Sequence, residues 1–101
     1  MVRHVILWKL KEEYGAERKE EIKRGIREQL EALNGKIPGM VRLKIVTEGL
    51  SSSNADVMLD SVFTDGAALS GYAVHPDHVK AADTFVRPFV ALRLCMDFPS
   101  D

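Results

Sequence analysis

The fold is decided by residues 2–10, which read VRHVILWKL. Successive side chains of an extended strand point to opposite faces, so this stretch has two faces with different members. One face carries Val2, His4, Ile6, Trp8 and Leu10, and the other carries Arg3, Val5, Leu7 and Lys9. Large apolar side chains occupy the middle of both. Because strands of this kind are covered on both sides, we expect protein on either face of residues 2–10.

Two helical regions and three further strands are predicted downstream. Apolar side chains at helical spacing predict a helix over residues 16–34, through Ile22, Ile26, Leu30 and Leu33. Alternating apolar side chains predict strands over residues 40–48, 56–64 and 89–98. In the first of these strands the apolar face is expected to hold Val41, Leu43, Ile45 and Thr47. Between the last two strands we expect a short helix to about residue 72, capped by Asp65, and a second helical segment over residues 76–86.

The predicted order is therefore strand, helix, strand, strand, helix, strand. This is the split βαβ pattern of the ferredoxin-like architecture, an α+β fold. Right-handed crossovers place both helical connections on one face of a four-stranded antiparallel sheet. The other face still carries apolar side chains and needs a second layer. We therefore expect residues 1–101 to form one domain that pairs with a second copy, as a homodimer with a barrel-like core between two sheets (a dimeric α+β barrel).

Composition narrows the classes of partner. The formal net charge of −1 gives no reason to expect nucleic acid or an anionic membrane as a partner. The single cysteine, Cys95, excludes an internal disulfide and predicts no cysteine-based metal cluster. No apolar run approaches the length of a membrane span, and the strand-like start does not resemble a signal peptide. A cytoplasmic protein is the simplest expectation.

The second decisive stretch is residues 71–88, which hold two of the three histidines. Pro76 suits the first position of a helix, which makes His75 its cap and places His78 in the first turn. The positive end of the helix dipole opposes protonation of His78, so we expect a neutral imidazole near pH 7. Such a group can remove a proton next to a carbonyl, while the Tyr72 hydroxyl orients it or donates to the developing oxyanion. Residues 71–88 therefore predict a candidate acid–base site with His78 and Tyr72 as its catalytic pair.

These two stretches together resemble the Dabb family, the stress-responsive dimeric α/β-barrel domains. The resemblance lies in residues 2–10, in Tyr72-Ala-Val-His75-Pro76-Asp-His78-Val79 and in Phe85-Val-Arg-Pro88. It implies the ferredoxin-like fold and the face-to-face dimer. Members include stress-associated proteins and a plant polyketide cyclase that works without a cofactor. In that cyclase the residues matching Tyr72 and His78 carry out the chemistry, and the N-terminal histidine, here His4, lies near the pocket.

We accordingly predict a pocket for a small apolar molecule, with no cofactor and no metal. Its binding contacts are assigned to His4, Ile6, Trp8, His75 and Val79. His75 and His78 have a spacing found in some helical metal sites, but Pro76 removes His75 from a regular helical position.

Structural roles stand beside these functional ones. His75 reads as a cap, His78 as a group bonded to nearby backbone, and His4 as a hydrogen-bonded core histidine. Arg93 and Asp97 could form a salt bridge at the dimer interface, and Cys95 is expected to be an inert thiol among apolar neighbours. Two function classes follow: a dimeric barrel with cofactor-free acid–base chemistry, or a non-catalytic stress-related or structural dimer.

Overall fold

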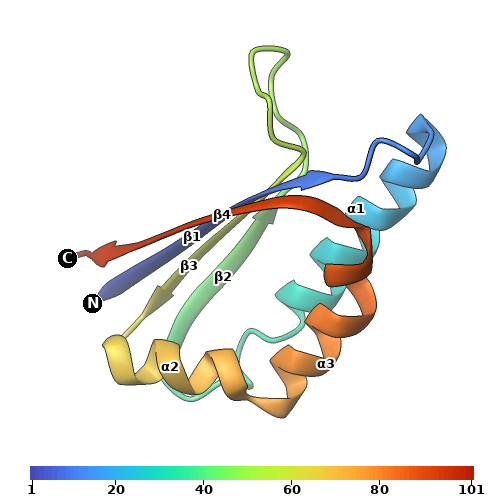
Figure 1. The fold of residues 1–101 in the computed structure, drawn as a ribbon. Helices are drawn as coiled ribbons and strands as arrows, with labels where there is room; N and C mark the ends of the chain where they lie inside the picture. Colours follow the sequence, from blue (N-terminus) through green and yellow to red (C-terminus); the bar gives the residue numbers. More distant parts are fainter.

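A computed structural model describes residues 1–101 as a four-stranded sheet with all helices on one face (Figure 1). The elements in chain order are β1 (Val2–Leu10), α1 (Ala16–Glu31), β2 (Met40–Val46), β3 (Val57–Phe63), α2 (Gly66–Val74), α3 (Pro76–Phe85), a 3-10 turn (Arg87–Phe89) and β4 (Val90–Pro99). This is the ferredoxin-like order predicted from the sequence, and that prediction is confirmed. None of the helices combines the length and apolarity needed to cross a membrane.

The strand order is β2-β3-β1-β4, and all neighbouring strands are antiparallel. β1 is thus an inner strand, with β3 on one side and β4 on the other. His4 lies opposite Ser61 of β3 and opposite Asp97 of β4. Because alternate residues share a face, this register decides which side chains of all three strands point toward the helices.

The core lies between the helices and the sheet. Ile6, Trp8 and Leu10 of β1 are buried there, as the alternation of residues 2–10 predicts. The largest fully buried side chain is Phe63, at the end of β3. The helices contribute the buried apolar side chains of Ile22, Ile26, Leu30, Tyr72 and Ala81.

Helix α1 ends at Glu31, three residues before the predicted end at Asn34. The Asn34 side chain donates to the carbonyls of Glu31 and Leu43 and accepts from the Leu43 N–H, each at 2.9 Å. Glu31 accepts from the Ile45 N–H at 2.9 Å. These side chains satisfy backbone groups along the outer edge of β2, an edge that would otherwise be open to pairing with another chain. Asn side chains compete with helical backbone in this way.

One predicted face was wrong in part. Leu43 and Ile45 of β2 are buried, but Val41 is half exposed. The register of β2 against β3 shifts between Met40 and Arg42. A bulge of this kind moves a residue off the face that alternation assigns to it.

The predicted caps of α2 and α3 are confirmed. Asp65 accepts from the Ala68 N–H at 2.8 Å, and His75 Nδ1 accepts from the Asp77 N–H at 3.1 Å. Pro76 begins α3. The break between Val74 and Pro76 turns the chain, so that α3 leads away from α2 and runs beside α1 (Figure 1).

The face of the sheet opposite the helices, here called the open face, carries exposed apolar side chains. Leu7 of β1 is 38% exposed, and three side chains of β4 are more so: Leu92 at 51%, Leu94 at 58% and Met96 at 69%. Arg3 of β1 and Asp60 of β3 form a bidentate ion pair on this face. Arg3 Nε donates to Asp60 Oδ1 at 2.9 Å, and Arg3 Nη2 donates to Asp60 Oδ2 at 2.7 Å. The Arg3 guanidinium holds the pKa of Asp60 below its usual value. The open face is therefore apolar along β4 and charged toward β2, where Arg42 and Lys44 also lie near Asp60.

The Asn34 side chain should contribute measurably to stability. Asn34→Ala removes three hydrogen bonds to backbone, two of them partly buried and one exposed, so we expect a loss of roughly 1–2 kcal/mol in the free energy of unfolding. Urea denaturation measures the free energy of unfolding of the variant and of the unchanged chain. Asn54→Ala, in the exposed connector between β2 and β3, is the matched control and should change little. Equal stabilities of the two variants would contradict the role given to Asn34.

Candidate functional site

A small cavity lies where the α2–α3 corner faces β1 and β4. Its volume is about 120 Å³, and its lining is formed by His4, Ile6, Trp8, Leu69, Tyr72, Ala73, His78, Ala82, Val86, Arg87 and Arg93. The cavity exists because the helices do not cover β4, whose residues are nearly all exposed along the strand. The helix-facing side of β4 therefore forms one wall of a hollow instead of part of the core.

Five of the seven predicted site residues line this cavity: Tyr72, His78, His4, Ile6 and Trp8. His75 and Val79 do not. His75 is half-buried and is occupied as the cap of α3, because its Nδ1 accepts a hydrogen bond from the Asp77 N–H. Val79 lies on the next turn, and its N–H donates to the His75 carbonyl. The catalytic roles of Tyr72 and His78 and the binding roles of His4, Ile6 and Trp8 stay predictions.

Tyr72 is only 3% exposed and packs among aromatic rings. Its ring centroid lies 5.1 Å from that of Phe63 and 4.1 Å from that of His78. Burial raises the pKa of Tyr72, and the charge of Arg93 only partly offsets this. The phenol therefore stays protonated at every physiological pH, as a hydrogen-bond donor. No fully buried polar side-chain atom lacks a hydrogen-bond partner, so the unbonded Tyr72 hydroxyl is not fully buried. Tyr72 is among the residues that line the cavity.

His78 is held by the backbone of the preceding helix. Its Nδ1 donates to the Ala73 carbonyl at 3.3 Å, which leaves Nε2 unprotonated in the neutral ring. Burial lowers the pKa of His78, and the nearby charges of Arg87 and Arg93 lower it further. The neutral imidazole was expected from the helix dipole, but burial is the largest cause. His78 is thus available as a proton acceptor through Nε2.

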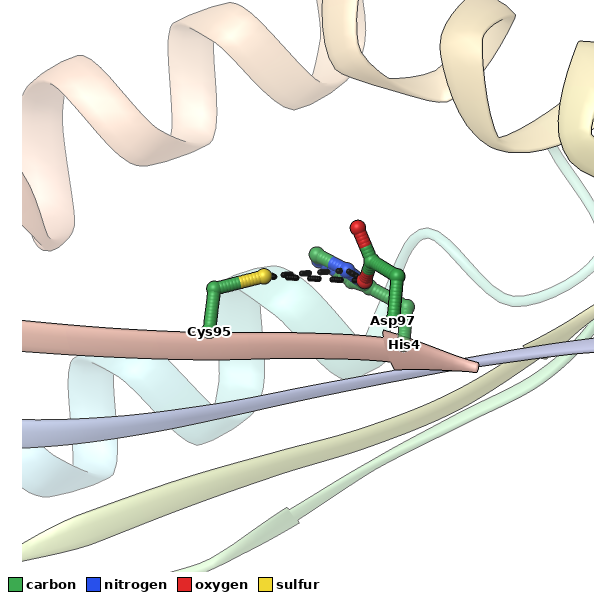
Figure 2. Close-up of side chains that lie close together, drawn as sticks. All are labelled: His4, Cys95 and Asp97. Carbon is green, nitrogen blue, oxygen red and sulfur yellow. Dashed lines mark hydrogen bonds and ion pairs between the residues drawn. The ribbon is translucent and has the colours of Figure 1, made fainter. Parts of the chain in front are cut away.

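His4 lies beside Asp97 and Cys95, on the helix-facing side of the sheet (Figure 2). Its Nδ1 donates to Asp97 Oδ1, and Cys95 Sγ lies 3.7 Å from the same nitrogen. Burial and the negative charge of Asp97 raise the pKa of Cys95, so the thiol is protonated.

Two expectations about β4 were wrong. Asp97 pairs with His4, not with Arg93. Cys95 is exposed and lies beside polar groups. Its apolar sequence neighbours, Leu94 and Met96, point to the open face instead. Alternation along β4, read together with its pairing to β1, would have placed Arg93, Cys95 and Asp97 beside His4.

Arg93 is the lining residue of most consequence that sequence reasoning missed. It forms no ion pair, whereas Arg87, the other cation at the cavity, pairs with Asp83 on α3. Since Tyr72 and His78 are neutral, Arg93 gives the cavity a positive end. A negatively polarised oxygen is the group that this end favours.

Larger hollows lie elsewhere but lack such chemistry. One of about 360 Å³ between α1 and the α3–β4 junction is lined by charged side chains such as Arg18, Glu21 and Arg24. Another of about 290 Å³ lies beneath the β2–β3 connector, against Leu7 and Met58 of the open face. Neither contains a histidine or tyrosine, so the cavity at Tyr72 and His78 is the candidate site.

Comparison with known protein families assigns the chain to one of them. The profile of the Dabb family, the stress-responsive A/B barrel domain, matches residues 2–100. The chain belongs to the Dabb family. A comparison with curated protein sequences found no match.

Solved structures share the fold over nearly the whole chain. A dimeric protein of unknown function with a ferredoxin-like fold, from Bacteroides fragilis, is 27% identical, with 96% of this chain and 93% of that one covered and a TM-score of 0.89. A hydroxynitrile lyase from Passiflora edulis is 17% identical, covers 96% and 90%, and has a TM-score of 0.72. SnoaB, a cofactor-independent oxygenase from Streptomyces nogalater, is 19% identical, covers 98% and 91%, and also has a TM-score of 0.72. The last two likenesses show the fold alone.

The lowered pKa of His78 predicts the direction in which folding stability changes with pH. In the unfolded chain a histidine has a pKa of about 6.5, and in the folded chain the pKa of His78 is lower, so it takes up its proton only at lower pH. Folding stability should therefore fall as pH drops from about 6.5 toward the folded pKa, because the unfolded chain binds more protons. Histidine NMR titration gives the pKa directly.

The variant His78→Asn removes this linkage while its amide can still donate to Ala73. We expect its unfolding free energy to fall less between pH 6.5 and pH 5 than that of the unchanged chain. A His78 pKa at or above the ordinary value would contradict the buried, neutral imidazole.

Proposed function

We propose that this chain is a homodimer, assembled through the open face, whose cavity binds a small, mainly apolar carbonyl compound and catalyses proton transfer next to its carbonyl group. The observation that carries the catalytic part is the stacked pair of a neutral His78 and a protonated Tyr72 in one small cavity. A base and a hydrogen-bond donor are the two groups that enolisation requires.

The step assigns one role to each group. His78 Nε2 takes the proton from the carbon next to the carbonyl, and the electron pair of that C–H bond moves onto the carbonyl oxygen. The Tyr72 hydroxyl donates a hydrogen bond to this oxygen, and the unpaired Arg93 favours its negative charge. Return of the proton from His78 to carbon or oxygen completes an isomerisation, while attack of the enolate on a second carbonyl gives an aldol product.

The lowered pKa of His78 also restricts the substrate. A weakly basic imidazole removes only a fairly acidic proton, so a C–H bond flanked by two electron-withdrawing groups suits it best. The cavity volume of about 120 Å³ is below the range of about 300–1,000 Å³ found for drug-sized ligands. Small 1,3-dicarbonyl compounds fit both limits, whereas long chains do not.

The dimer follows from the open face and agrees with the relatives. Leu92, Leu94 and Met96 together leave an apolar surface that a second layer would cover. Solved structures with this fold from Bacteroides fragilis and Thermobifida fusca are described as dimeric. A second copy supplies an identical apolar face, which is what a two-fold interface needs.

Leu94→Asp should convert the dimer to a monomer. It places a charge among the apolar side chains of the open face, where a buried unpaired carboxylate is costly. Analytical ultracentrifugation at micromolar concentration measures the mass. Leu50→Asp, at a side chain that is 81% exposed in the β2–β3 connector, is the matched control and should remain dimeric. A monomeric unchanged protein would refute the interface.

The catalytic pair is tested by deuterium exchange. We expect the protein to accelerate exchange of the activated C–H protons of small 1,3-dicarbonyl compounds in heavy water, followed by NMR. His78→Asn should lower this rate by roughly 10²–10⁴-fold, and Tyr72→Phe should lower it while keeping the ring packing.

Matched controls remove the same groups outside the cavity. His75→Asn keeps a residue suited to capping, and Tyr14→Phe keeps the ring that packs on Phe89. Both should leave the rate unchanged. Full exchange activity in either His78→Asn or Tyr72→Phe would refute that residue's role, and no acceleration by the unchanged protein would favour a non-catalytic dimer.

A further inference from the structure

The side chains of His4, Cys95 and Asp97 form a cluster that the acid–base step does not use (Figure 2). One ligand atom from each lies within 4.8 Å of the others. We propose that these three side chains bind one zinc-like divalent cation, in a tetrahedral site whose fourth position is open.

The spacing of the ligand atoms matches a tetrahedral site. Zinc lies about 2.3 Å from a thiolate sulfur and about 2.0–2.2 Å from a histidine nitrogen or carboxylate oxygen, so tetrahedral angles place the sulfur about 3.5–3.7 Å from either neighbour. In this chain Cys95 Sγ lies 3.7 Å from His4 Nδ1 and 3.5 Å from Asp97 Oδ1. Two of the three edges between ligand atoms already have the required length.

The third edge is shorter, because a proton joins His4 Nδ1 to Asp97 Oδ1. A cation in place of this proton requires a separation of about 3.3 Å. The His4 proton would then reside on Nε2, the other ring nitrogen. Asp97 can make this adjustment, because its side chain is 44% exposed and stands on an edge strand.

The rest of the site is already ordered. The His4 side chain is 7% exposed, and the carbonyl of His4 accepts a hydrogen bond of 2.9 Å from the Ser61 hydroxyl. His4 and Asp97 are directly paired across β1 and β4, and Cys95 is two residues along the same strand face. Ligands on two paired strands hold their spacing better than ligands on loops.

The donor set selects the kind of cation. Sulfur, nitrogen and oxygen together suit zinc, whereas magnesium and calcium favour all-oxygen ligands. Coordination displaces the Cys95 thiol proton, and the thiolate and the Asp97 carboxylate then balance the two positive charges. Three protein ligands with one open position are the arrangement of catalytic zinc sites. Since His4 also lines the cavity, the open position lies beside the proposed ligand site.

The sequence predicted no cysteine-based cluster because only one cysteine is present. The site proposed here needs one thiolate, one imidazole and one carboxylate, which are far apart in sequence and meet only through the pairing of β1 with β4.

Cobalt titration of the full chain tests the site, with no ligand present. We expect saturation at one Co²⁺ per chain, with near-ultraviolet thiolate-to-metal absorption and the intense visible bands of tetrahedral cobalt. Zn²⁺ should displace the cobalt. Since Cys95 is the only thiol, its rate of reaction with a thiol reagent should fall by about tenfold or more when Zn²⁺ is bound.

Variants of Cys95 and Asp97, the two exposed ligands, distinguish a metal site built from three side chains from metal binding by the Cys95 thiol alone. Cys95→Ser should abolish the thiolate band, and Asp97→Asn should weaken binding about tenfold or more. His75→Asn, which removes a histidine outside the cluster and keeps a capping residue, should bind as the unchanged chain does. Absence of saturable binding, unchanged Cys95 reactivity in Zn²⁺, or unchanged affinity in Asp97→Asn would each overturn the proposal. None of these readouts depends on catalysis at His78.

Discussion

The structure depends on the pairing of β4 with β1 at a place that the helices do not reach. β1 is inner and β4 is an edge strand, so β4 is held mainly by its ladder to β1. The helices bury the helix-facing side of β1, β2 and β3, but they leave both sides of β4 largely exposed. The apolar open face and the candidate site therefore both include side chains of β4.

The two sides of β4 have different chemistry because side chains alternate. Leu92, Leu94 and Met96 add to the apolar open face, whereas Arg93, Cys95 and Asp97 face the cavity and the His4 side chain. One strand therefore contributes both to the surface of the proposed dimer and to the candidate site. A one-residue slip of β4 would exchange the two sets, so the register of this ladder matters more to function than any single contact.

The cavity itself is formed by the break between α2 and α3. His75 and Pro76 end one helix and start the next, which brings Tyr72 and His78 into contact at a ring distance of 4.1 Å. Burial then acts on both groups in the direction that proton transfer at neutral pH needs: the phenol stays protonated and the imidazole stays neutral. The same burial limits the strength of His78 as a base and hence the substrates suited to the proposed reaction.

The sequence predicted the fold because β1, α1 and the helix caps follow local rules. Alternation in residues 2–10, helical spacing at Ile22 to Leu33 and the caps Asp65 and His75 all agree with the structure. It predicted Tyr72 and His78 in one cavity because they flank a single helix break. It missed Arg93 and the surroundings of Cys95, because their neighbours come from β1 and from the helix corner. It also misplaced Val41, since a bulge depends on strand pairing that spacing alone does not reveal.

The central claim is that the open side of β4 is covered by a second copy while its other side remains part of a site. Methyl NMR with a soluble paramagnetic agent tests this on the unchanged protein at the level of single residues. The account predicts that the methyl groups of Leu94 and Met96 are protected from the agent, while those of Leu50 are strongly relaxed. Relaxation of Leu94 and Met96 as strong as that of Leu50 would contradict it.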